Sequence, residues 1–153
     1  MRNLNINFLE EYKSVDNICK DIFGTRDGIT EYIRIMENTP WQDYKCVSTW
    51  QSDYSELKHA RWVRNQITHE NGTMDSDICS QNDFDWIKDF RWRILNSKDP
   101  LTIIRLKKEE KAKNQRLLQQ ELKKKQNNNA IQETNNPKEK KSLWERIKKF
   151  FWG

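Results

Sequence analysis

The chain has 153 residues, of which 35% are apolar, 4 are Gly and 3 are Pro, and its mean hydropathy is -1.09. This length accommodates one small domain and an additional polar segment. The small number of Gly and Pro residues, which form tight turns, argues against a β-sandwich or barrel. Residues 1–100 carry 13 basic and 17 acidic side chains (net -4), whereas residues 101–153 carry 15 and 6 (net +9). An acidic body should not hold a long phosphate backbone by bulk attraction. No apolar run approaches the ~20 residues that span a bilayer, nor does the opening stretch resemble a signal peptide, so we expect a cytoplasmic, all-α protein.

The body, residues 1–105, is predicted to be a bundle of four helices. The first spans about 5–23, where apolar residues recur on one face, and it ends before Gly24, a typical C-cap residue. The second opens at Asp27-Gly28 and ends before Thr39-Pro40, because the residue before a proline disfavours helix. The stretch that follows, to Gln51, is irregular and rich in Trp and Tyr, and we expect an ordered loop there.

The two remaining body helices flank a polar loop. The third is predicted to begin near Ser52 or Asp53 and to continue to Asn71-Gly72. The fourth is predicted to begin at Asn82, a residue type that often caps helix N-termini.

Beyond the body, the composition becomes strongly polar and then changes again. Asp99-Pro100 is a helix start signal, with Asp at N-cap and Pro at N1, and the helix is predicted to extend as a charged arm over 106–126. Residues 127–141 are mostly Asn, Lys and Glu, a composition that predicts a disordered linker. Residues 142–153 then form a short amphipathic helical segment by pattern.

The three cysteines are widely spaced, with no CxxC pair and no clustered histidines to complete a zinc site. We therefore expect reduced thiols, and neither a metal site nor a cofactor.

Acid-base chemistry near neutral pH has two natural candidates, His59 and His69. His69 ends the sequence Arg64-Asn65-Gln66-Ile67-Thr68-His69, in which a polar residue follows the arginine and four residues separate it from the histidine. This motif resembles the signature of the HEPN superfamily, helical-bundle proteins of which many are metal-independent ribonucleases. The resemblance extends over the body, through Leu57 to Val63 before the motif, Glu70 after it, and Asp99-Pro100-Leu101 after the next helix. No Tyr follows His69 at +2 or +3, which departs from the regulated toxin subgroup of that superfamily.

These residue types suit RNA cleavage without a metal. An imidazole can take the proton from the attacking 2′-hydroxyl or give one to the leaving 5′-oxygen. A forked guanidinium stabilises charge on the phosphoryl oxygens, which suits Arg64, and Asn65 could orient phosphate or His69. The structural alternative is an Arg64 that pairs with Asp53, Glu56 or Glu70 and a His69 that caps the helix.

The spacing of the motif bears on oligomeric state. On an ideal helix, five positions turn Arg64 and His69 about 140° apart. Either the helix unwinds after about Thr68, or two subunits share a cleft, or both. We expect a homodimer, as the resemblance also implies.

Weaker candidates for RNA contact are the basic and aromatic residues of two body helices: Arg61, Arg91, Trp92 and Arg93. At helical spacing, a half-exposed Trp flanked by solvated Arg is the structural alternative.

The last segment concentrates apolar side chains on one helical face, with basic residues beside it. The candidate contacts to an anionic membrane surface or to a protein groove are Leu143, Trp144, Ile147, Phe150, Phe151, Trp152, Lys148 and Lys149.

Two functions follow. The first is a homodimeric ribonuclease with RNA as substrate, acting as a toxin or phage-defence effector, with an antitoxin or regulator as a further partner. The second is a non-catalytic helical adaptor that dimerises through the body and is localised by its tail to a membrane surface or a partner.

Overall fold

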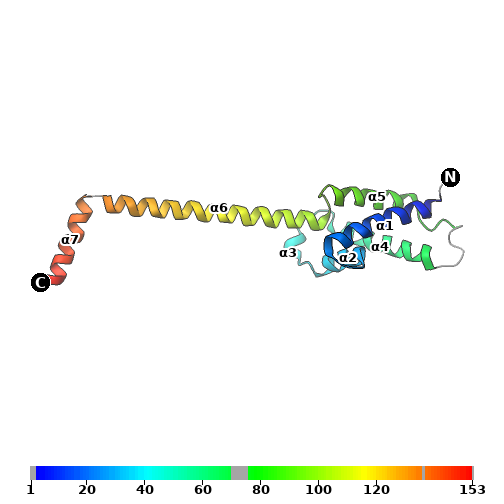
Figure 1. The fold of residues 1–153 in the computed structure, drawn as a ribbon, viewed down its shortest axis with the longest axis horizontal. Helices are drawn as coiled ribbons and strands as arrows, with labels where there is room; N and C mark the ends of the chain where they lie inside the picture. The colour runs from blue at the N-terminus through cyan, green and yellow to red at the C-terminus, as the bar shows by residue number, and fades with distance from the viewer. Residues whose placement is uncertain (1–2, 70–75, 136, 153) are drawn as a thin grey trace. The chain divides into compact units, whose positions relative to one another are not determined.

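The computed structural model describes residues 3–69, 76–135 and 137–152. Over these residues it contains helices and no strand, which confirms the all-α prediction (Figure 1). The helices are α1 (Leu4–Phe23), α2 (Gly28–Asn38), α3 (Trp41–Tyr44), α4 (Trp50–His69), α5 (Gln81–Leu95), α6 (Pro100–Asn135) and α7 (Pro137–Trp152). The chain divides into two compact units, Met1–Lys107 and Lys108–Gly153.

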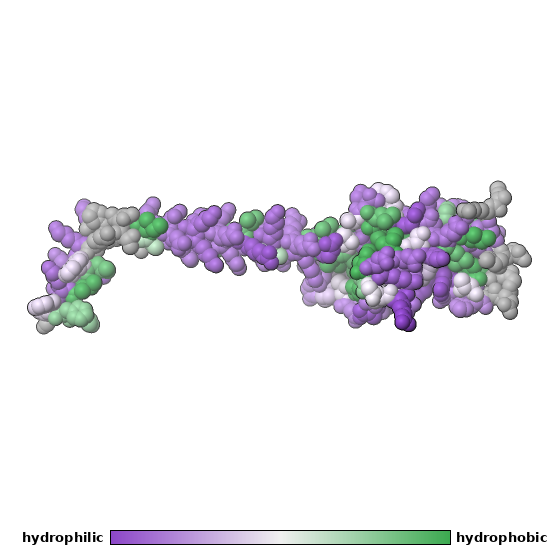
Figure 2. All heavy atoms as spheres, in the orientation of Figure 1, coloured by the Kyte–Doolittle hydropathy of each residue, from purple (hydrophilic) through white to green (hydrophobic). Residues whose placement is uncertain are grey.

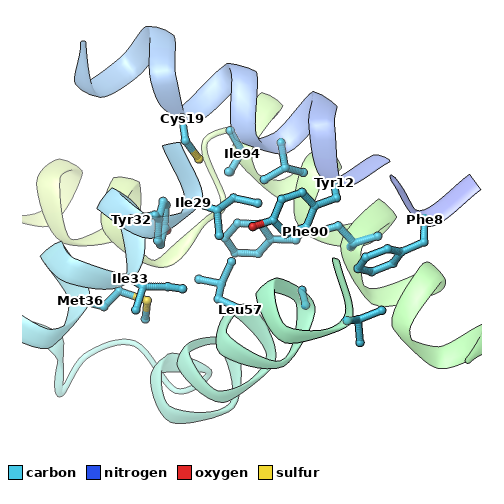
Figure 3. Close-up of a cluster of buried hydrophobic side chains, with 14 of the residues drawn as sticks. Phe8, Tyr12, Cys19, Ile29, Tyr32, Ile33, Met36, Leu57, Phe90 and Ile94 are labelled. Carbon is cyan, nitrogen blue, oxygen red and sulfur yellow. The ribbon is translucent and has the colours of Figure 1, made fainter. Parts of the chain in front are cut away.

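In the first unit, α1, α2, α4 and α5 enclose a hydrophobic core (Figure 3). Ile29 and Ile33 of α2, Leu57 of α4 and Phe90 of α5 are almost completely buried there. The rings of Tyr32 and Phe90 meet edge to face, with centroids 5.4 Å apart. Burying each such side chain stabilises the bundle by about 1.5–3 kcal/mol, so packing of the apolar faces holds these helices together.

The connection from α1 to α2 is tight and depends on two glycines. Gly24 ends α1 in the left-handed region (φ 64°), and its N–H donates to the Lys20 carbonyl. At Gly28 an added Cβ would lie 2.1 Å from the carbonyl oxygen of Asp16, so only glycine fits. The same Asp16 accepts the N–H of Ile29 at 2.9 Å, and a side chain of α1 therefore caps α2.

The predicted loop before the third body helix contains α3, and α4 begins at Trp50, earlier than expected. Tyr44 at the end of α3 stacks on Trp50 with ring centroids 4.8 Å apart. Trp50 is only 4% exposed. Tertiary packing of this indole stabilises the early start of α4.

The fourth body helix, α5, is capped by Ser80 and not by Asn82 as predicted. Ser80 and Asp83 form a capping box, in which each side chain accepts the other's backbone N–H. Asn5 of α1 holds the chain before this cap, because its amide donates to the Ser76 carbonyl and accepts the N–H of Cys79.

The start of α6 at Pro100 confirms the Asp-Pro signal. Asp99 accepts the N–H of Thr102 at 3.3 Å and the Tyr32 hydroxyl at 2.7 Å, which fastens this end to α2. The prediction of a disordered linker over 127–141 is wrong for the residues described there, since α6 continues to Asn135 and α7 begins at Pro137. No Gly or Pro interrupts α6 after Pro100, and Pro137 is tolerated at the first position of α7.

In the second unit, every side chain whose environment is described is exposed. Within the described residues, no helix combines the length and the apolar composition that crossing a bilayer requires.

Candidate functional site

The last turns of α4 carry Arg64, Asn65 and His69, and the helix is unbroken from the first to the last of them. Ile67, between them, is buried and holds this part of α4 on the core. Unwinding of the helix, one of the two alternatives for the motif, is not seen as far as His69, and the predicted end at Asn71-Gly72 lies outside the described residues. A continuous helix sets Arg64 and His69 about 7.5 Å apart along its axis and about 140° apart around it.

Arg64 lies at the edge of the core, with its side chain exposed to solvent. Its guanidinium donates from Nη1 to Oδ1 of Asn65 at 2.9 Å and lies 6.0 Å from the ring centroid of Tyr12. Among the described residues it forms no ion pair, and Asp53, a predicted structural partner, binds Arg93 instead. Arg64 is thus held in place by a neutral amide and an aromatic ring, and most of its donors face water.

Tyr12 belongs to this site, although the sequence did not predict it there. Burial, followed by the charge of Asp16, raises the pKa of Tyr12 to about 12, although Arg64 and Arg61 act in the opposite direction. Its phenol is consequently neutral near pH 7, and its ring provides a support for Arg64. Tyr12 precedes Arg64 by 52 positions, and a contact across that separation leaves no pattern in the sequence.

His69 is the last residue of α4 and is exposed. Its imidazole makes no hydrogen bond or ion pair with another described residue. A substrate arriving from solvent can therefore reach it.

His59 differs, because its imidazole is engaged by the fold. Nε2 lies 2.9 Å from Oδ1 of Asp83, and the ring stacks on Trp62 with centroids 5.7 Å apart. This histidine links α4 to the capping box of α5 and so has a structural explanation that His69 lacks.

The weaker RNA-contact candidates are not brought to the motif, apart from Arg61, which is half-buried on α4 near Tyr12. On α5, Arg91 pairs with Glu11 at 2.7 Å, and Trp92 lies under the ammonium of Lys98, 4.7 Å from its ring centroid.

Arg93 is the most enclosed of these candidates, with 16% of its side chain exposed. It makes two 2.8 Å hydrogen bonds to the carboxylate of Asp53 and a third, at 2.9 Å, to Asp89. These contacts give the guanidinium of Arg93 a structural role.

The candidate tail residues all lie on α7 and are all exposed. Across the described parts of the chain, no three His, Cys, Asp or Glu side chains are grouped closely enough to hold a metal ion.

Comparison with known proteins gives a family but no characterised relative. The chain matches the family of unknown function DUF6548 over residues 6–151, and it belongs to that family. No curated protein and no solved structure matches it.

Proposed function

We propose that this member of the DUF6548 family is a metal-independent endoribonuclease of HEPN type that acts as a homodimer. The observation that carries the proposal is the state of the motif on α4: Arg64 and His69 are both exposed, and neither is neutralised by a described carboxylate. His59 and Arg93 contact Asp83 and Asp53, respectively, and so have structural roles. The absence of such contacts at the motif residues, among the residues described, supports a role in binding or catalysis.

The proposed reaction is an intramolecular transfer at phosphorus. The 2′-oxygen of a ribose bonds to the adjacent phosphorus as the bond from phosphorus to the 5′-oxygen breaks, leaving a cyclic phosphate and a 5′-hydroxyl. The imidazole of His69 takes the 2′-hydroxyl proton, and the imidazolium that results supplies a proton to the leaving 5′-oxygen. Arg64 stabilises the charge on the non-bridging oxygens, and its contact with Asn65 aligns the guanidinium.

A homodimer suits this chemistry for a geometric reason. Within one subunit the unbroken helix directs Arg64 and His69 to different sides of α4. A two-fold axis beside α4 would bring Arg64 of one subunit to His69 of its partner, and it would form two such shared sites in each dimer. The composite site is thus part of the proposal.

The direct test is cleavage of RNA by the full chain in EDTA. We expect Arg64→Ala and His69→Ala each to lower the rate by about 100-fold or more, with products that carry a cyclic phosphate or a 3′-phosphate. The matched controls are Arg34→Ala, which removes an exposed guanidinium paired with Glu31 on α2, and His59→Ala. Full activity in both folded motif variants, or a requirement for added Mg²⁺, would refute the proposal, and an absence of cleavage by wild type would favour the non-catalytic adaptor.

The composite site is tested by mixing the two inactive variants. An Arg64→Ala subunit paired with a His69→Ala subunit restores one of the two shared sites. Random pairing should therefore recover about a quarter of wild-type activity. If the mixture stays inactive while wild type cuts RNA, each site lies within one subunit and the dimer argument fails.

Unrestrained RNA cleavage harms the cell that contains it. The cellular role that we propose is accordingly that of a toxin or phage-defence effector, held in check by an antitoxin or another regulator. Induced expression of wild type should arrest growth, and His69→Ala should relieve the arrest.

A further inference from the structure

The C-terminal helix α7 carries a hydrophobic face that its own unit does not cover. Five large apolar side chains fall within about 120° of arc on this helix: Leu143, Trp144, Ile147, Phe150 and Phe151. Their exposed fractions run from 48% at Ile147 to 89% at Phe150. Figure 2 shows hydrophobic atoms grouped on α7, whereas α6 is mostly hydrophilic. So much clustered apolar surface in a strongly polar region is typical of a binding face.

The charges around this face identify the surface that it fits. Lys148 lies about 40° beyond one edge of the apolar arc, and Arg146 about 40° beyond the other. The ammonium of Lys148 lies 5.3 Å from the ring centroid of Trp144, so its stem follows the apolar face while its charge stays at the border. Residues 137–153 contain six basic and two acidic side chains, a net charge of +4.

A helix of 16 residues is about 24 Å long, and its charged side prevents it from spanning a bilayer. Such a helix can lie in the plane of the interface, with aromatic and aliphatic side chains among the acyl chains and basic side chains at the headgroups. Basic side chains along both edges of the apolar face complement a layer of anionic headgroups, because that layer lies on both sides of a helix embedded in it. A protein groove would require acidic residues placed along both rims.

We propose that α7 is an interfacial anchor that binds the full-length protein to anionic lipid bilayers. The anchor is reversible, because its apolar area is that of one short helix and its electrostatic attraction is screened by salt. It gives the protein a membrane location irrespective of whether the body cleaves RNA.

Flotation of the full chain with vesicles tests this anchor. We expect binding to vesicles of phosphatidylglycerol and phosphatidylcholine, little binding to phosphatidylcholine alone, and release as salt rises toward about 1 M. Leu143→Glu, on the apolar face, should weaken binding at least about tenfold. The matched control is Leu122→Glu on α6, where the replaced leucine is 51% exposed, and it should bind as wild type does.

The charge requirement is tested with two variants of equal net charge. Replacing Lys148 and Lys149 together by Glu should abolish binding to anionic vesicles, whereas the same double change at Lys123 and Lys124 on α6 should leave most of it. Equal losses in the two variants would mean that total charge and not α7 is responsible, which overturns the proposal. Failure of wild type to float with any vesicle also overturns it and would favour a protein groove.

Discussion

The ion pair between Arg93 and Asp53 makes a sharp prediction about stability. Arg93→Met keeps an unbranched apolar stem above Phe90, whose ring centroid lies 5.2 Å from the guanidinium, but it removes the charge. The carboxylate of Asp53 is then left in the core with 3% of its side chain exposed and both of its Arg93 hydrogen bonds lost. Breaking a buried pair in this way costs about 3–5 kcal/mol in the free energy of unfolding.

We expect the lower end of that range, about 3 kcal/mol, since water still reaches 16% of the Arg93 side chain. For a unit of this size such a loss lowers the melting temperature by about 12–15 °C. The measurement is urea and thermal unfolding followed by circular dichroism. Arg91→Met is the matched control, because Arg91 is 39% exposed in its pair with Glu11 and should contribute at most about 1 kcal/mol.

A double variant separates the lost pair from the stranded charge. Asp53→Leu combined with Arg93→Met removes both ions, and its stability should return to within about 1–2 kcal/mol of wild type. If Arg93→Met proves as mild as Arg91→Met, the carboxylate of Asp53 is solvated and our account of this pair is wrong. Cleavage per folded molecule should be unchanged in Arg93→Met, in contrast to the motif variants.

Three further predictions concern buried polar and thiol groups. Tyr32→Phe removes a hydroxyl that donates to Asp99 and accepts the first free N–H of α6, and urea unfolding should show a loss of about 1–3 kcal/mol; an unchanged midpoint would mean that water replaces the hydroxyl. Burial raises the pKa of Cys19 from 9.0 to about 12, so above about pH 9 the unfolded chain loses a proton that the folded one keeps. Stability should therefore fall as pH rises, by up to about 1.4 kcal/mol per pH unit from this group, and an equally steep fall in Cys19→Ala would contradict this assignment. Of the three thiols, only Cys46 is exposed, and it alone should react promptly with a thiol reagent under native conditions; equal reaction of Cys79 would show that its burial is transient.

Much of the helical plan is determined locally, and the sequence predicts it for that reason. The end of α1 at Gly24 and the start of α6 at Asp99-Pro100 depend on backbone preferences and caps that act within a few residues. The amphipathic face of α7 follows from helical spacing alone. The disordered linker was wrongly predicted because polar composition indicates only that a segment lacks a core. It does not terminate a helix that has already begun and meets no Gly or Pro.

Contacts between distant positions were decided by the tertiary structure. Asp53 binds Arg93, which lies 40 positions later in the sequence. Arg64 lies against Tyr12, and the sequence places Tyr12 only on the apolar face of its own helix. The choice of Ser80 over Asn82 as a cap is of the same kind, because Asn5 holds the preceding chain. The sequence names the residue types that could do chemistry on α4. Which arginines and histidines stay exposed and which are engaged by carboxylates depends on how α1, α4 and α5 pack, since a charge is neutralised by whichever partner lies within a few ångströms.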